Sequence, residues 1–257
     1  MEDLKIVYSL SDNRNFRGQA LNSLKSLSRF VDKENITVIC NPPYKSKQFE
    51  RLADYGTLYQ GSEEYQKLDL PLFRYKIELC DIKCDNLIFL DCDTIIMKDI
   101  TKLLDGDYDF YAKEEPCRSF AGELKGTWND IYWKEILKYL SLPLDALPYN
   151  DGFCIFKNRL HTKIKDKWIE YYQNYHNKIW NSPNTVDDMH HNEFALSLAI
   201  AGYKCKVMGD TEHFFGWRAV PYTHSDETYV LHIGTNKAGI SGYLYNLSRH
   251  YIPEGTL

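Results

Sequence analysis

A run of four apolar residues, 87–90, leads directly into Asp91, Cys92 and Asp93. Such a short apolar run predicts a buried strand of a sheet. Because side chains alternate along an extended chain, Asp91 and Asp93 can face one side while Cys92 faces the other. Paired carboxylates suit a hard divalent cation, and ligands of open α/β sheets bind at the carboxyl ends of strands. The motif therefore predicts a metal site with open positions for phosphate oxygens.

The same spacing of aspartates recurs at Asp105 with Asp107 and at Asp107 with Asp109. Neither pair follows an apolar run, and the first pair encloses a glycine, which is typical of a turn. We interpret these acids as solvated loop residues. For Asp91 and Asp93 the alternative is a polar strand end without a ligand, and the buried strand before them favours the metal site.

Short apolar runs alternate with amphipathic stretches along the chain. This alternation predicts a βαβα series and parallel strands joined by right-handed crossovers. The expected strands cover residues 5–9, 36–40, 57–59, 87–90, 110–112, 152–157, 205–208 and 229–232, and the expected helices cover residues 18–30, 47–55, 71–81, 128–140, 159–176 and 192–201. No repeat or linker interrupts the pattern. We expect one α/β domain over residues 1–257, with helices flanking a mixed, mainly parallel sheet.

The composition of the 257-residue chain excludes some classes of function. Its net charge is −5 and it has no basic stripe, which argues against a nucleic-acid partner. No apolar run is long enough for a membrane span, and the acidic start of the chain is unlike a signal peptide. The seven cysteines form no C-x-x-C pair, as expected of reduced thiols. We therefore expect a cytoplasmic protein.

Two polar motifs later in the chain are candidates for the same site. Asn150, Asp151 and Gly152 come at the start of an expected strand, where a glycine permits close approach of backbone or ligand. A plain turn before the strand explains this motif equally well. Asn192 and Glu193 open an expected helix. Helix capping and a favourable carboxylate in the first turn are sufficient to explain that pair.

A late strand, 229–232, ends in His232 and is followed by Gly234 and Lys237. Imidazole is a suitable third ligand for Mn²⁺ beside carboxylates. A lysine in the loop after the strand can hold a phosphate. Because a histidine alone is more often packed or solvated than bound to a metal, this interpretation depends on the two aspartates.

In this order, the motifs resemble those of glycosyltransferases of the GT-A fold, and most closely those of glycosyltransferase family 8. The resemblance covers about residues 4–237. It implies a metal site formed by Asp91, Asp93 and His232, with Mn²⁺ as the cation and Mg²⁺ as the alternative. It also implies residues that bind the uracil, ribose, diphosphate or sugar of the donor: Ser9, Ser11, Asn13, Arg74, Asp91, Asn150, Gly152, Gly234 and Lys237.

The chain departs from the family pattern at several positions. Asp151 stands where the family has a small residue, Glu193 replaces an amide, and Ser11 replaces an acid of the first loop. The segment after the late strand is one residue shorter. The resemblance places Asn192 and Glu193 near the reacting carbon as catalytic candidates. Asp151 or Glu193 would be the general base if the reaction inverted the anomeric configuration.

The resemblance implies a metal-dependent enzyme that moves a hexose from a UDP-sugar to a hydroxyl acceptor on a glycan, a lipid-linked sugar or a protein, with retention. Residues 1–104 would bind the nucleotide, and residues 105–257 the sugar and the acceptor. The alternatives are a GT-A enzyme of another family, with another nucleotide sugar or with inversion, and a catalytically silent nucleotide-sugar-binding protein. A phosphatase of the haloacid dehalogenase type fits less well, because it needs threonine four residues after the first aspartate and Thr94 comes three after.

Overall fold

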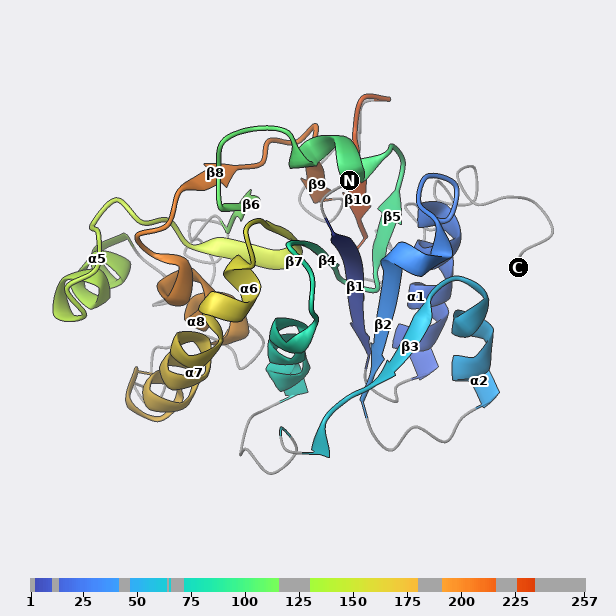
Figure 1. Cartoon of the computed structure of the whole chain (residues 1–257). Coiled ribbons are helices and arrows are strands. Elements are labelled where there is room, and N and C mark those ends of the chain that lie inside the picture. The colour runs from blue at the N-terminus through green and yellow to red at the C-terminus, as the bar shows by residue number, and fades with distance from the viewer. Residues whose placement is uncertain are drawn as a thin grey trace.

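The computed structural model describes residues 3–10, 14–41, 47–63, 65, 72–115, 130–179, 191–215 and 226–233. These residues form a seven-stranded sheet and a three-stranded sheet, with helices around the larger one (Figure 1). Within this part of the chain, no helix combines the length and the apolar character that a membrane span requires.

The larger sheet has the strand order β3-β2-β1-β4-β7-β6-β8. β3, β2, β1 and β4 run parallel to one another, and β6 pairs with β8 in parallel. Among the described strands of this sheet, β7 alone runs antiparallel to its neighbours, β4 and β6. The expected mixed, mainly parallel sheet is therefore confirmed. The strands are β1 (Leu4–Leu10), β2 (Ile36–Cys40), β3 (Thr57–Gln60), β4 (Asn86–Leu90), β6 (Phe110–Glu114), β7 (Tyr149–Phe156) and β8 (Cys205–Val207).

The smaller sheet has the order β5-β10-β9. β5 (Thr94–Ile96) is antiparallel to β10 (Val230–His232), and β9 (His213–Phe215) is parallel to β10. Only residues 91–93 separate the end of β4 from the start of β5. The chain therefore passes from one sheet to the other through the two aspartates and the cysteine between them.

Helices cover both faces of the larger sheet (Figure 1). One face packs against α1, with smaller contributions from α2, η2 and η4, and the other packs against η3, α6, α7 and α8. A separate apolar cluster joins α5 to α8. The helices are α1 (Arg14–Leu27), η1 (Lys33–Asn35), α2 (Lys47–Glu50), η2 (Arg51–Asp54), η3 (Leu72–Asp81), η4 (Ile100–Leu104), α5 (Asp130–Tyr139), α6 (Leu160–Lys163), α7 (Lys165–Ile179) and α8 (His191–Ile200), where η denotes a 3₁₀ helix.

The strand β4 is buried on both sides, which fixes the position of the aspartates that follow it. Ile88 and Leu90 belong to the cluster under α1, whereas Leu87 and Phe89 belong to the cluster under η3 and α7. This alternation is the period of two that a strand imposes. Because each buried apolar side chain contributes about 1.5–3 kcal/mol, the strand end is held firmly in the core.

Three elements differ from the sequence-based expectation. The stretch 159–176 is divided into α6 and α7 at Ile164, and Leu160, Ile164 and Trp168, spaced four residues apart, still pack into one cluster. The helix expected over 71–81 is a 3₁₀ helix. β7 begins at Tyr149, earlier than expected, because its first residues already pair with β6. The motif at 150–152 therefore lies inside a strand, and its interpretation as a turn is wrong.

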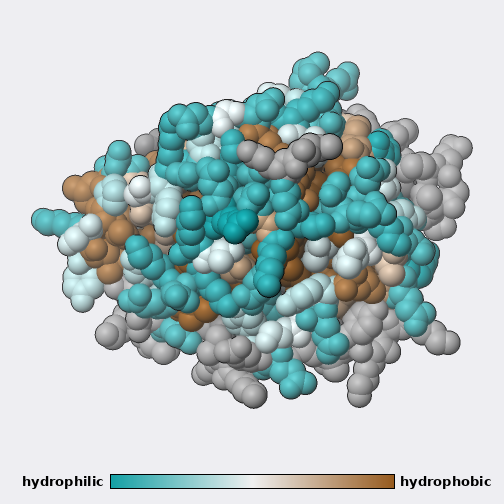
Figure 2. Space-filling model, viewed as in Figure 1, coloured by the Kyte–Doolittle hydropathy of each residue, from teal (hydrophilic) through white to brown (hydrophobic). Residues whose placement is uncertain are grey.

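The face shown in Figure 2 is mainly hydrophilic, with hydrophobic side chains at the end that carries α5 and in patches nearer the middle. The most exposed large hydrophobic residues of the described chain, Tyr139 and Leu144, lie at the end of α5 and in the loop after it. This end of the molecule is distant from α1 and α2 (Figure 1).

Candidate active site

The two aspartates lie in the turn between β4 and β5, where the two sheets meet. The backbone N–H of Asp91 donates to the carbonyl of Gly152 at 2.8 Å, and the N–H of Ile233 donates to the carbonyl of Asp93 at 2.8 Å. The hydroxyl of Thr94 donates to the carbonyl of Asp91 at 2.7 Å. Hydrogen bonds from both sheets thus fix the turn and the direction of its carboxylates.

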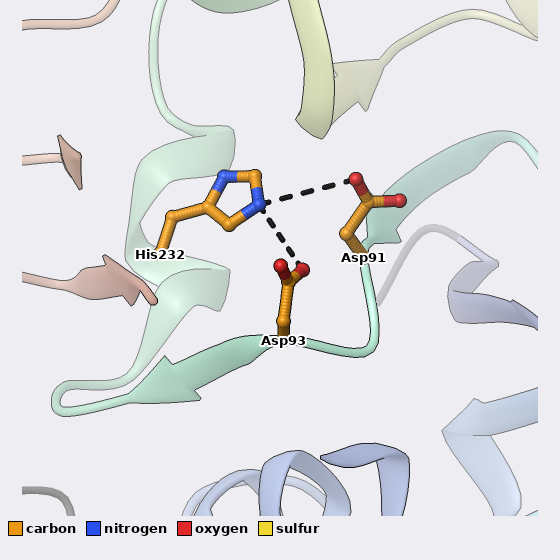
Figure 3. Close-up of side chains that lie close together, drawn as sticks. All are labelled: Asp91, Asp93 and His232. Atoms are coloured by element: carbon orange, nitrogen blue, oxygen red, sulfur yellow. Dashed lines mark hydrogen bonds and ion pairs between the residues drawn. The ribbon is translucent and has the colours of Figure 1, made fainter. Parts of the chain in front are cut away.

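His232 is the last residue of β10 and points at both carboxylates (Figure 3). Its Nε2 atom lies 3.1 Å from Asp93 Oδ1 and 4.0 Å from Asp91 Oδ2. One ligand atom from each of the three residues lies within 4.8 Å of the other two. Two carboxylates and an imidazole are a suitable donor set for Mn²⁺. The three predicted ligands are therefore brought together, and they fit a divalent cation.

The charges in this cluster depend on one another. Burial would raise the pKa of Asp93, but the charge of His232 and its hydrogen bond outweigh burial and lower that pKa. Burial would lower the pKa of His232, and the carboxylate of Asp93 raises it instead. Burial raises the pKa of Asp91 despite the nearby ammonium group of Lys76. Two carboxylates this close favour a cation between them.

Lys76 supplies a positive charge that the sequence analysis did not find. It projects from η3, and its Nζ atom lies 2.8 Å from Asp91 Oδ1 and 2.6 Å from Asp151 Oδ1. Burial would lower the pKa of Lys76, but the two carboxylates outweigh it and raise the pKa, so the ammonium stays charged. Arg74, predicted for this helix, lies two residues earlier, and its side chain is outside the described part. The sequence around Lys76 has no pattern that distinguishes it from the other lysines, so its role could not be predicted.

Asp151 is buried on β7 and has both of its oxygens engaged. Oδ1 accepts from Lys76, and Oδ2 accepts from the side-chain amide of Asn192. α8 begins at His191, so Asn192 lies in the first turn rather than at the cap. Helix capping therefore does not account for Asn192, whose amide joins α8 to β7. The two contacts of Asp151 thus link β7 to η3 and to α8.

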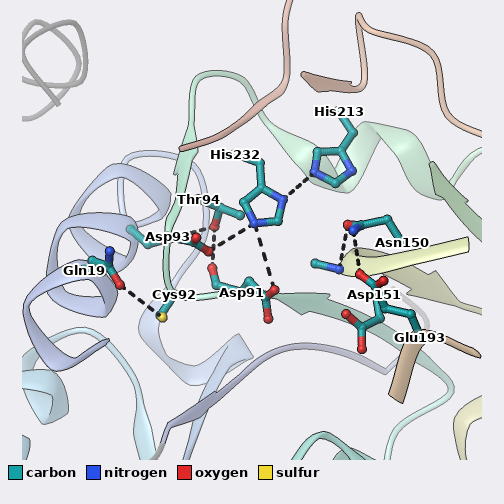
Figure 4. A network of polar contacts seen from close by, with 12 residues as sticks. Gln19, Asp91, Cys92, Asp93, Thr94, Asn150, Asp151, Glu193, His213 and His232 are labelled. Atoms are coloured by element: carbon teal, nitrogen blue, oxygen red, sulfur yellow. Dashed lines mark hydrogen bonds and ion pairs between the residues drawn. The ribbon is translucent and has the colours of Figure 1, made fainter. Parts of the chain in front are cut away.

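Asn150 joins two buried glutamates, Glu193 (labelled in Figure 4) and Glu115. Its amide nitrogen lies 2.7 Å from Glu193 Oε1 and 3.1 Å from Glu115 Oε2. Glu193 was predicted near the reacting carbon, whereas Glu115 was not predicted. Glu115 follows the end of β6, and its buried position gives the site a further carboxylate.

The glycine of this motif makes room for the metal-binding histidine. A Cβ atom added to Gly152 would lie 2.3 Å from Cε1 of His232. The close approach that the sequence indicated is therefore made by a side chain of the protein. The other ring nitrogen of His232, Nδ1, lies 3.1 Å from Nε2 of His213. His213 is buried, and the sequence does not predict its place in the site.

The remaining predicted residues lie partly beyond the described chain. Ser9, near the end of β1, has its hydroxyl 3.2 Å from the side-chain amide of Asn41. Ser11, Asn13, Gly234 and Lys237 are outside the described residues.

The mixed seven-stranded sheet, its flanking helices and the position of the cluster at a strand end define the GT-A fold of glycosyltransferases. More particularly, the chain is similar to the galactosyltransferase LgtC, solved with donor and acceptor sugar analogues. The TM-score is 0.64 and the identity 13%, over 99% of this chain and 100% of that chain.

Two further solved structures share this fold. The bifunctional glycosyltransferase WbbM matches with a TM-score of 0.65 at 13% identity, over 98% of this chain and 50% of its own. The glycosyltransferase GlyE of Streptococcus pneumoniae TIGR4 matches with a TM-score of 0.61 at 16% identity, over 98% of this chain and 62% of its own. No protein-family model and no curated protein matches the sequence. At these identities the likeness shows the fold.

Proposed function

We propose that the protein is a metal-dependent glycosyltransferase that moves a hexose from a UDP-sugar to a hydroxyl acceptor. The observation that carries the proposal is the cluster of Asp91, Asp93 and His232 at the junction of the two sheets of a GT-A fold. The names of the similar structures, among them a galactosyltransferase with donor and acceptor sugar analogues, support the reaction class. Family 8 membership and retention of configuration follow from the sequence resemblance and belong to the proposal.

One group of site residues would act on the nucleotide part of the donor and another on the sugar. Asp91, Asp93 and His232 would hold Mn²⁺ or Mg²⁺, and a bound cation would neutralise charge on the departing diphosphate. Lys76 keeps Asp91 and Asp151 in place by charge-assisted hydrogen bonds.

The buried carboxylates beyond the metal cluster would contact the sugar. The side-chain amide of Asn150 donates to Glu193 and orients it, and the same amide also donates to Glu115. Glu193 would lie beside the anomeric carbon and stabilise positive charge that develops there. If the reaction inverted the configuration, Asp151 or Glu193 would act as the general base, and both carboxylates already accept hydrogen bonds within the site.

A thermal-shift titration tests the donor class. The protein is heated with UDP, GDP or CMP, each with Mn²⁺ or with EDTA. A ligand that binds only the folded state raises the unfolding free energy, by about 2.7 kcal/mol at a concentration 100 times its Kd. The melting temperature rises as a result. We expect stabilisation by UDP that requires Mn²⁺. Stabilisation by GDP in place of UDP would contradict the proposal of a UDP-sugar donor. No stabilisation by any of the three nucleotides would contradict the proposed glycosyltransferase function.

A pair of aspartate variants tests the metal site. Asp93→Asn removes one ligand charge at constant size, and we expect sugar transfer from a UDP-sugar panel to fall about 100- to 1000-fold. Asp105→Asn is the matched control, because Asp105 belongs to the exposed pair of the same spacing. Unchanged transfer by Asp93→Asn would exclude the proposed metal site.

A further inference from the structure

A second imidazole, His213, lies next to His232 with its ring plane nearly parallel to that of His232. The two residues lie on the parallel strands β9 and β10, in which His213 pairs with Val230 and Phe215 pairs with His232. The ring centroids are 5.2 Å apart and the ring planes differ by 12°. His213 Nε2 lies 3.1 Å from His232 Nδ1, on the side away from the two aspartates (Figure 4).

The chemistry of imidazole gives this contact a role. A neutral histidine binds a metal through the lone pair of one ring nitrogen and carries its proton on the other. Nε2 of His232 faces Asp93, so binding through Nε2 requires the proton on Nδ1. His232 is buried, and a buried N–H group needs an acceptor. Nε2 of His213 is at hydrogen-bonding distance from that proton.

His213 is itself held rigidly. It is fully buried, and its ring meets Phe215 and Phe153 edge-on, with centroids 4.5 Å and 5.5 Å away. Nζ of Lys113 donates to its backbone carbonyl at 2.6 Å. Since Gly152 closes off the Cε1 side of His232, the metal-facing ring is confined between β7 and His213.

We propose that His213 is a positioning residue of the metal site, which accepts the Nδ1 hydrogen of His232 and thereby fixes the tautomer and ring orientation that present Nε2 to a divalent cation. The inference rests on the metal-dependent function proposed above. Outer partners of this kind typically change metal affinity about 10- to 100-fold when they are removed.

Two variants separate the hydrogen bond from ring packing. His213→Phe keeps an aromatic ring but offers no acceptor, whereas His213→Gln keeps an acceptor at a similar reach. Mn²⁺ binding is measured from the electron paramagnetic resonance signal of free Mn²⁺, with and without UDP. We expect His213→Phe to bind Mn²⁺ about 10- to 100-fold more weakly and His213→Gln to retain most of the wild-type affinity.

Two further measurements exclude a purely structural effect. Urea unfolding in EDTA checks that His213→Phe and His213→Gln remain folded. Long-range ¹H–¹⁵N spectra with Mg²⁺, a diamagnetic cation, report which ring nitrogen of His232 carries the proton, and we expect Nδ1 in the wild type.

The outcomes distinguish this inference from the function on which it rests. If the wild type binds no Mn²⁺, the proposed function and the role of His213 both fail. If the wild type binds Mn²⁺ and His213→Phe binds it equally well, only the role of His213 is overturned. Folded His213→Gln that binds as weakly as His213→Phe would also overturn the hydrogen-bond role.

Discussion

At Gly152 there is no space for even one added methyl group. A Cβ atom would lie 2.3 Å from Cε1 and 2.9 Å from Nδ1 of His232, and 3.0 Å from Oδ1 of Asn150. Because β7 is held between β4 and β6, the histidine is the part that must move. We expect Gly152→Ala to weaken Mn²⁺ binding and to cost about 1–3 kcal/mol of unfolding free energy.

Gly18→Ala is the matched control for this substitution. Gly18 lies in α1, and nothing lies within 4 Å of an added Cβ. Alanine there should raise the unfolding free energy by about 0.5–1 kcal/mol and leave Mn²⁺ binding unchanged. Titration calorimetry and urea unfolding measure both quantities. Equal Mn²⁺ affinity in Gly152→Ala and the wild type would contradict the close approach.

The burial of His161 leads us to expect a lower free energy of unfolding in mild acid. The residue is fully buried in α6, and its Nε2 lies 2.9 Å from the carbonyl oxygen of Ile82. Burial lowers its pKa below the ordinary value of 6.5. As pH falls below 6.5, the unfolded chain binds a proton at this residue before the folded protein does. Stability is therefore complete above 6.5 and declines below it, by at most about 1.4 kcal/mol per pH unit for one group.

The contribution of His161 is isolated by comparing urea unfolding of the wild type and His161→Gln at pH 7.5 and pH 5.5. We expect the wild type to lose more stability between these pH values than the variant does, since the other titrating groups are common to both. A variant that loses as much as the wild type would show that His161 does not titrate below its unfolded pKa.

At the scale of the elements, Lys76 connects η3 to the ends of β4 and β7. Its ammonium is the counter-charge for two buried carboxylates, Asp91 and Asp151. We expect Lys76→Met, measured in EDTA, to cost about 3–5 kcal/mol, because buried charge is left uncompensated. Asp151→Asn added to Lys76→Met should restore part of this loss, and urea unfolding of the four members of the cycle measures the coupling.

An exposed ion pair provides the comparison for Lys76. Lys98 and Glu227 also form a salt bridge, but the side chains are 30% and 78% exposed. Lys98→Met should therefore cost less than about 1 kcal/mol. A cost for Lys76→Met as small as that for Lys98→Met would argue against a structural role of the buried pair.

The sequence predicts some of these elements well and others poorly, for physical reasons. β4 and its aspartates were predictable because a short apolar run that ends in polar residues fits few structures other than a buried strand. β5 and β9 have three residues each and no periodicity to detect. Lys76, Glu115 and His213 reach the site from elements far apart in sequence. Their roles depend on three-dimensional packing, which leaves no local pattern.

For the whole molecule, the metal cluster is the place where the two sheets are joined. Asp91 follows β4 of the larger sheet, Asp93 directly precedes β5 of the smaller sheet, and His232 ends β10 of the smaller sheet. A cation held by all three would therefore restrain the smaller sheet relative to the larger. We expect Mn²⁺ to slow amide hydrogen exchange in residues 94–96, 213–215 and 230–232 more than in β2 and β3.

Hydrogen exchange followed by mass spectrometry makes this comparison peptide by peptide. Asp93→Asn should abolish the difference between the two sheets, since it removes the ligand charge that directly precedes β5. Uniform slowing across both sheets would indicate general stabilisation and not coupling at their junction.

The separation of the metal ligands along the chain bears on the order of events in folding. His232 lies 139 residues beyond Asp93. Closing so large a loop is entropically costly and slow. The nascent chain carries both aspartates long before it carries the histidine. We therefore expect the three ligands to come together late in folding, once β10 has paired with β5.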